Sequence, residues 1–131
     1  MGIERILVCG GRDYEDYAFL RDVMDHYAPS VVIHGAARGA DSLADRWARS
    51  RCVAVERHPA DWKRDGRAAG PIRNVKMLAE GKPDLVIAFP GGNGTDHMAK
   101  VATVKGVHVI HPRRGAFIFL PLSGVKDNPD V

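Results

Sequence analysis

Glycine-rich stretches that could bind an anion follow three short apolar runs of the sequence. The clearest stretch is Pro90-Gly91-Gly92-Asn93-Gly94-Thr95, which lies between the apolar run 85–89 and a helix-like segment. Proline ends the run because it has no N–H for a strand ladder, and glycines let the backbone turn and approach a ligand closely. Thr95 is expected to cap the following helix. Free N–H groups and a positive helix end would then meet, as in a phosphate site; the alternative is a tight turn that binds nothing.

Two earlier glycine loops carry charged side chains that suit the same ligand. Arg12 and Arg38 each lie beside such a loop, and guanidinium groups match phosphate oxygens in geometry. Asp41 could cap a helix, or it could hold a ribose hydroxyl or a ligand amine. The predicted ligand contacts in these loops are Gly10, Gly11, Arg12, Gly35, Arg38, Gly39 and Asp41.

The polar stretch 61–74 supplies further candidates. Trp62 could be a core or lid aromatic, or a platform on which a base stacks. Arg73 could meet a phosphate or form a surface ion pair, and Asn74 could bond a sugar or anchor the loop. His97 is expected near the predicted phosphate, in the first turn of the helix after the third loop. With that loop, the predicted contacts also include Trp62, Arg73, Asn74, Pro90, Gly91, Gly92, Gly94 and Thr95.

Alternating strands and helices must position these residues. Apolar runs predict strands at 6–10, 31–33, 52–55, 85–89 and 107–110, and apolar periodicity predicts helices at 15–27, 40–50, 71–80 and from 95 onward. Residues 58–70 are expected to form a long loop, Gly81 to cap the third helix, and 116–120 to form an extra edge strand or an interface segment. This rhythm indicates an α/β fold: a Rossmann-like three-layer sandwich with a mainly parallel sheet of about five strands. The amides of all three glycine loops should then point toward one anion at one edge of the sheet.

Composition narrows the class of protein. A chain of 131 residues predicts a single domain over 1–131, with a core at about 5–111 and a C-terminal extension at 112–131. A net charge of +3 permits a phosphorylated ligand but does not require nucleic acid. Cys9 and Cys52 are expected to be buried free thiols. We expect no metal site, because the six histidines lack metal-binding spacing, and no cofactor, because the GxGxxG fingerprint is absent after the first strand.

No signal peptide and no membrane span is evident, so a cytoplasmic protein without a membrane partner is expected. The apolar segment 117–120 suggests a homo-oligomer.

Four blocks together resemble the SLOG superfamily, which includes the DNA-processing protein DprA and the Lonely Guy (LOG) nucleotide hydrolases. They are Gly10-Gly11-Arg12-Asp13, the run from His34 to Asp41, the run from Asp61 to Asn74, and Pro90 to Thr95. Within the superfamily the chain is most similar to the small YspA-like branch. The resemblance implies a Rossmann-like domain that binds nucleotides or nucleotide-derived small molecules.

The sequence departs from the LOG pattern at one position. LOG enzymes carry PGGxGTxxE, and the position of that glutamate is Met98 here, which can neither give nor accept a proton. Arg73 matches the arginine of the LOG pattern. The catalytic candidates are therefore Arg73, Asp96 and Asp41, with Asp13 as a further carboxylate.

Three hypotheses follow from the sequence. The first is a binding module for a nucleotide-derived phosphorylated small molecule, acting as a sensor, carrier or sequestering protein. The second is a LOG-like nucleoside 5'-monophosphate phosphoribohydrolase that uses a displaced carboxylate. The third is DprA-like binding of single-stranded DNA, with Trp62 for stacking and a set of basic side chains: Lys63, Arg64, Arg67, Arg113 and Arg114.

Overall fold

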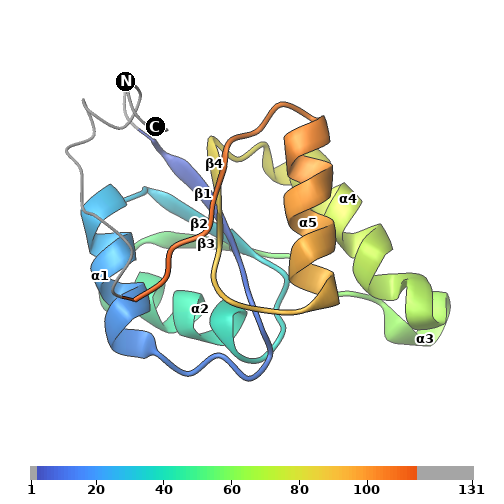
Figure 1. Cartoon of the computed structure of the whole chain (residues 1–131), viewed down its shortest axis with the longest axis horizontal. Helices are drawn as coiled ribbons and strands as arrows, with labels where there is room; N and C mark the ends of the chain where they lie inside the picture. The colour runs from blue at the N-terminus through green and yellow to red at the C-terminus, as the bar shows by residue number, and fades with distance from the viewer. Residues whose placement is uncertain (1–2, 115–131) are drawn as a thin grey trace.

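A sheet of five parallel strands forms the middle layer of the protein. The computed structural model describes residues 3–114, and Figure 1 shows the sheet with helices on either side. The strand order is β3-β2-β1-β4-β5, and every neighbouring pair is parallel. The strands are β1 (Arg5–Cys9), β2 (Val31–His34), β3 (Ala54–Arg57), β4 (Leu85–Ala88) and β5 (Val109–Ile110). The predicted Rossmann-like α/β sandwich is confirmed.

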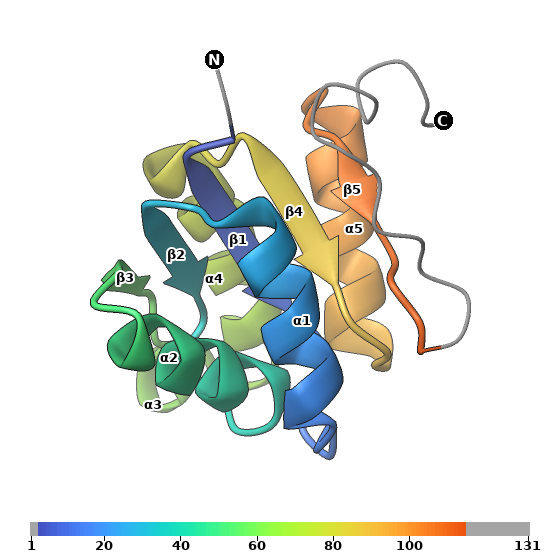
Figure 2. The same ribbon diagram turned by 90° about the vertical axis from the view of Figure 1, so that its left-hand side faces the viewer.

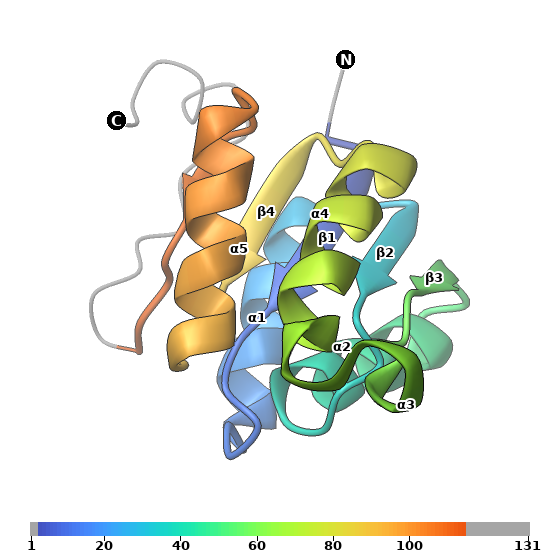
Figure 3. The same ribbon diagram turned by 90° about the vertical axis from the view of Figure 1, so that its right-hand side faces the viewer.

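Two helices cover each face of the sheet. The helices α1 (Tyr17–Tyr27) and α2 (Ala40–Ser50) lie over one face, as Figure 2 shows. Figure 3 shows α4 (Ala69–Gly81) and α5 (Asn93–Val104) over the other face. The three central strands β1, β2 and β4 are largely apolar because both of their faces are buried, whereas the edge strands β3 and β5 are only partly covered. Each face of the sheet packs into its own core cluster. Trp47 and Phe89 belong to the first cluster, and Met77 and Met98 to the second.

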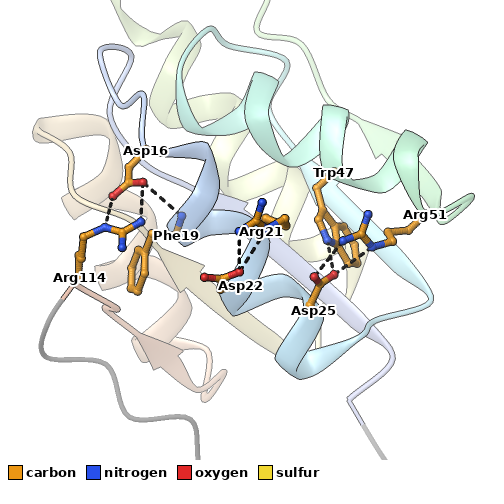
Figure 4. A network of polar contacts seen from close by, with 8 residues as sticks. All are labelled: Asp16, Phe19, Arg21, Asp22, Asp25, Trp47, Arg51 and Arg114. Carbon is orange, nitrogen blue, oxygen red and sulfur yellow. Dashed lines mark hydrogen bonds and ion pairs between the residues drawn. The ribbon is translucent and has the colours of Figure 1, made fainter.

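Polar contacts along α1 join it to the neighbouring elements (Figure 4). Asp16 caps α1 by accepting from the Phe19 N–H at 3.2 Å, and Arg114 donates to the same carboxylate at 2.7 and 2.9 Å. Near the other end of the helix, Asp25 accepts from the Trp47 indole N–H at 2.8 Å. These bonds fasten α1 both to α2 and to the chain that follows β5.

The segment predicted as a long loop, 58–70, is partly helical, so that prediction was wrong. It contains a short helix, α3 (Trp62–Asp65), and a 3-10 turn, η1 (Gly66–Ala68). Asp61 starts α3 by accepting from the Arg64 N–H at 3.1 Å. Neither element has a buried residue, so no apolar period marks it in the sequence.

Helix ends also differ from the predictions. The third predicted helix begins at Ala69 rather than at Pro71, and its left-handed C-cap is Lys82 rather than Gly81. The last predicted helix begins at Asn93 after an N-cap at Gly92, so Thr95 lies inside the helix and does not cap it.

The predicted third strand, 52–55, begins two residues later, at Ala54, because Cys52 lies in a turn with a positive φ of 57°. Cys52 is exposed, which corrects its predicted burial, whereas Cys9 is buried as predicted. The predicted strand or interface at 116–120 lies outside the described residues. Among residues 3–114, no helix combines the length and the apolar character that crossing a membrane requires.

Candidate functional site

The three glycine loops meet at the carboxyl ends of β1, β2 and β4. The Gly11 N–H donates to the Pro90 carbonyl at 2.9 Å, and the Ala40 N–H donates to the Gly11 carbonyl at 3.1 Å. Gly39 has a φ of +80°, and a side chain there would collide with the Gly11 carbonyl and the Arg12 backbone. The chain crosses from β1 to β2 in one direction along the sheet and reaches β4 on the other side. The loops therefore surround the switch point at which such sheets bind ligands.

A cavity of about 660 Å³ opens between these loops and the helices α3, α4 and α5. Its lining includes these predicted contacts: Gly10, Arg12, Gly35, Asp41, Trp62, Arg73, Asn74, Gly94 and Thr95. His97, which is expected from the sequence to lie near the phosphate, also lines the cavity. Three further lining side chains were not among the predicted ligand contacts: Cys9, Arg67 and Met77.

The remaining predicted contacts lie outside this lining and shape the loops. Gly11 and Pro90 hold two loops together, and a side chain on Gly91 would collide with the Thr95 hydroxyl. Arg38 borders a neighbouring hollow and lies 3.9 Å from the exposed carboxylate of Asp13.

Arg73 is the most enclosed basic group of the cavity. Its Nη1 donates to the carbonyls of Gly35 and His58, at 2.5 and 3.3 Å, and its Nε donates to Asn74 Oδ1 at 3.0 Å. A side chain on Gly35 would collide with this guanidinium group. Burial lowers the pKa of Arg73 from its ordinary value, and the nearby Asp41 opposes that shift. Within residues 3–114, Arg73 has no ion pair and its Nη2 has no hydrogen-bond partner.

Arg12 and Arg67 also line the cavity without an acid in ion-pair distance among the described residues. The guanidinium of Arg12 lies 5.5 Å from the ring centroid of Trp62, which is 49% exposed and lines the cavity. Elsewhere on the protein, most arginines that the structure describes pair with acids; Arg57, for example, contacts Asp45 at 2.7 Å. The cavity therefore concentrates positive charge that no described carboxylate neutralises by contact.

Asp41 is the only carboxylate in the lining of this cavity, as far as the described residues show. It is 6% exposed, and its Oδ2 accepts from the N–H groups of Gly35 and Ala37 at 3.1 and 3.2 Å. Burial raises the pKa of Asp41, although these hydrogen bonds oppose the shift. Asp41 therefore bonds the backbone of the second loop and does not cap α2. The N-cap of α2 is Gly39, which makes no side-chain hydrogen bond.

The amides of the three loops do not all face one ligand, so that expectation was wrong. In the second loop, Asp41 accepts from two N–H groups and His34 Nδ1 accepts from the Ala36 N–H at 2.9 Å. In the first loop, the Gly11 N–H is bonded to Pro90.

The third loop does leave amides available. The first intrahelical bond of α5 runs from the Asp96 N–H to the Gly92 carbonyl at 3.0 Å, so residues 93–95 have no intrahelical acceptor. Gly92 makes no side-chain cap, and all three of these residues line the cavity. This helix end is therefore the part of the loops suited to an anion.

The carboxylates proposed as catalytic differ in position. Met98, at the position of the LOG glutamate, is fully buried in the core between the sheet and the helices α4 and α5. Asp96 is exposed and does not line the cavity, and the side chain of Asp13 is 97% exposed. Asp41 and Arg73 both line the cavity. Within residues 3–114, no group of three or more His, Cys, Asp or Glu side chains is placed to hold a metal ion.

Two comparisons with known proteins identify relatives of this chain. Residues 4–64 match the family described as YspA, cpYpsA-related SLOG. The Gene 61 protein of Mycobacterium phage D29 is 39% identical over 121 aligned positions, and the match covers 83% of this chain and 96% of that protein.

Proposed function

The chain belongs to the YspA, cpYpsA-related SLOG family, and because membership of this family supports a nucleotide-related function, we propose that the protein binds a nucleotide-derived phosphorylated small molecule. The ligand occupies the cavity at the carboxyl ends of the strands. The protein acts as a sensor, a carrier or a sequestering module for it.

One observation supports this proposal above the others. Three arginines, Arg12, Arg67 and Arg73, line one cavity without a contacting acid in the described part of the chain, and the uncapped start of α5 lies in the same cavity. Guanidinium groups and free amides favour phosphate oxygens, and the exposed Trp62 offers a face for an aromatic base. A phosphorylated nucleoside supplies both chemical groups in one molecule.

Titration calorimetry with AMP, ADP and ADP-ribose tests the proposal. Arg73→Met removes a donor to the phosphate, so affinity for the bound nucleotide should fall at least tenfold, since hydrogen bonds to charged groups contribute about 1.5–3 kcal/mol. Arg46→Met is the matched control, because Arg46 lies over the Tyr17 ring, 3.9 Å from its centroid, and away from the cavity lining. The proposal fails if no nucleotide binds, or if both variants lose affinity equally.

A second candidate, N-glycosidic hydrolysis of a nucleoside 5'-monophosphate, draws support from Asp41. This buried carboxyl group lines the cavity with Arg73, and its raised pKa suits a group that exchanges protons. Release of free base from AMP by the wild type, lost in Asp41→Asn, would favour this candidate. A rate that is unchanged in that variant would remove Asp41 from the mechanism.

Single-stranded DNA binding has less support among the described contacts. Arg64 donates to Asp65 at 2.9 and 3.0 Å, and Arg114 pairs with Asp16, so part of the basic set is already neutralised. Steeply salt-dependent affinity for an oligonucleotide would reverse this preference.

A further inference from the structure

A buried asparagine joins Arg73 to His97 across the cavity. Asn74 lies on α4 and is 5% exposed. Its Oδ1 accepts from Arg73 Nε at 3.0 Å, whereas its Nδ2 lies 3.3 Å from the Gly94 carbonyl oxygen and 3.2 Å from His97 Nδ1. Every polar atom of the Asn74 side chain therefore contacts a neighbour whose hydrogen-bonding capacity can be assigned.

Two of these neighbours fix the orientation of the amide. A guanidinium group can only donate, so the Asn74 atom that faces Arg73 must be the oxygen. A backbone carbonyl can only accept, so the atom that faces Gly94 must be the nitrogen. Both requirements give the same orientation. The Asn74 N–H that remains is directed to His97 Nδ1, which must therefore accept it.

The hydrogen bond that His97 Nδ1 accepts determines which ring nitrogen of the neutral imidazole carries the proton. Neutral histidine carries one ring proton, so His97 must hold it on Nε2. His97 lines the cavity, and no described residue forms a hydrogen bond with its Nε2. The nitrogen that remains for a ligand is thus an N–H donor.

We propose that Asn74 is a positioning residue that sets the tautomer of His97, and that the His97 Nε2–H donates to a phosphate oxygen of the bound ligand. This inference rests on the proposed function, because it assigns a contact within the same cavity. His97 follows the first turn of α5, three residues after Gly94, and Asn74 connects it to Arg73. A neutral donor adds a hydrogen bond to those of Arg73 and the helix amides without adding charge.

His34 provides an internal reference for the tautomer. Its Nδ1 accepts from the Ala36 N–H at 2.9 Å, and its Nε2 lies 2.7 Å from Asp45 Oδ2. His34 therefore holds the same Nε2–H form, but it is 2% exposed and does not line the cavity.

Long-range ¹H–¹⁵N spectra of the imidazole rings test the positioning step without any ligand. At about pH 9, well above the ordinary histidine pKa of about 6.5, His97 and His34 should both show the Nε2–H pattern. Asn74→Asp keeps the contact with Arg73 but replaces the donor toward His97 with an acceptor, so His97 should shift its proton to Nδ1 while His34 stays unchanged. The positioning role would be refuted if wild-type His97 carried its proton on Nδ1, or if Asn74→Asp left the tautomer of His97 unchanged.

A double-mutant cycle with AMP as the probe tests the ligand contact. His97→Phe should weaken AMP binding about tenfold, a loss of about 1.4 kcal/mol. Asn74→Asp should weaken AMP binding in two ways, through its negative charge and through the changed tautomer of His97. The second contribution requires His97, so Asn74→Asp should reduce affinity about tenfold less when Phe replaces His97. Equal effects in both backgrounds would overturn the contact.

The two measurements separate this inference from the proposed function. Normal AMP affinity together with the wrong tautomer would refute the role of Asn74 and leave the proposed function standing. The expected tautomer without any binding of AMP, ADP, ADP-ribose or inorganic phosphate by the wild type would refute the proposed function and the His97 contact, while the role of Asn74 would remain.

Discussion

Asp45 gathers three basic side chains near the ends of β2 and β3, and its replacement by asparagine should destabilise the protein in a pH-dependent way. The carboxylate of Asp45, which is 8% exposed, contacts His34 and Arg57 at 2.7 Å and Arg49 at 2.9 Å. Burial acts to raise the pKa of Asp45, but hydrogen bonds from Arg57 and His34 outweigh it and lower the pKa from 3.8 to about 2.

The sign and size of the effect follow from that pKa. Because the folded-state pKa lies below the unfolded value, the ionised carboxylate stabilises the fold above pH 3.8, and this stabilisation is lost as the pH falls through about 2. At about 1.4 kcal/mol per pH unit, the difference corresponds to roughly 2 kcal/mol at neutral pH. About half of that should remain at pH 3, where the folded carboxylate is still mostly ionised.

Urea denaturation of the wild type and of Asp45→Asn between pH 7 and pH 2 measures this contribution. The difference in unfolding free energy should be roughly 2 kcal/mol at pH 7, about half of that at pH 3, and about 0.4 kcal/mol at pH 2. Other carboxylates with lowered pKa values, such as Asp16 and Asp25, titrate in both proteins and cancel in the difference. A difference that stays constant over this range would refute the reasoning.

Three further predictions concern a loop glycine, the α1–α2 contact and the thiols. Gly39→Ala should lower the free energy of unfolding by about 2 kcal/mol or more, measured by thermal denaturation, because φ is +80° and the new Cβ would collide with the Gly11 carbonyl. Gly92→Ala is the control and should change stability little, because Gly92 has a φ of −111° and open space around its Cβ position. Equal losses would contradict this account. Trp47→Phe should lower the unfolding free energy in urea by about 1 kcal/mol or more through loss of the 2.8 Å bond to Asp25, and an unchanged midpoint would contradict it. A thiol reagent should label native protein once, at the exposed Cys52. It should label Cys52→Ser only after unfolding, because Cys9 is buried and burial raises the pKa of its thiol. Two labels on native protein would contradict this.

The sequence predicted the parts of the fold in which local pattern and burial coincide. The strands β1, β2 and β4 are buried runs of apolar residues, and α2 has a clear apolar period, so its predicted bounds 40–50 match Ala40–Ser50. The helix α3 has no buried residue, and β5 has only two residues, so neither leaves a strong pattern. A local cap at Asp61 starts α3, and pairing with β4 defines β5, so apolar periodicity does not set the bounds of these elements.

The candidate site was predictable only in part for a similar reason. Glycines in the sequence indicate where backbones approach closely, and the three loops do meet. The sequence does not show which amides the protein itself uses, and Asp41 and His34 bond those of the second loop. Nor does it show which arginines are paired: Arg64 contacts Asp65, while Arg67, three residues later, has no ion pair among the described residues.

The self-bonded second loop has a consequence for binding kinetics. Its backbone is fixed by Asp41 and His34 before any guest arrives, so the conformational entropy of ordering it is lost during folding rather than on association. A ligand that enters the cavity contacts backbone that is already ordered on this side. Association should therefore proceed without a slow ordering step in this loop, and the lifetime of the complex should depend on how fast the guest leaves its arginine contacts.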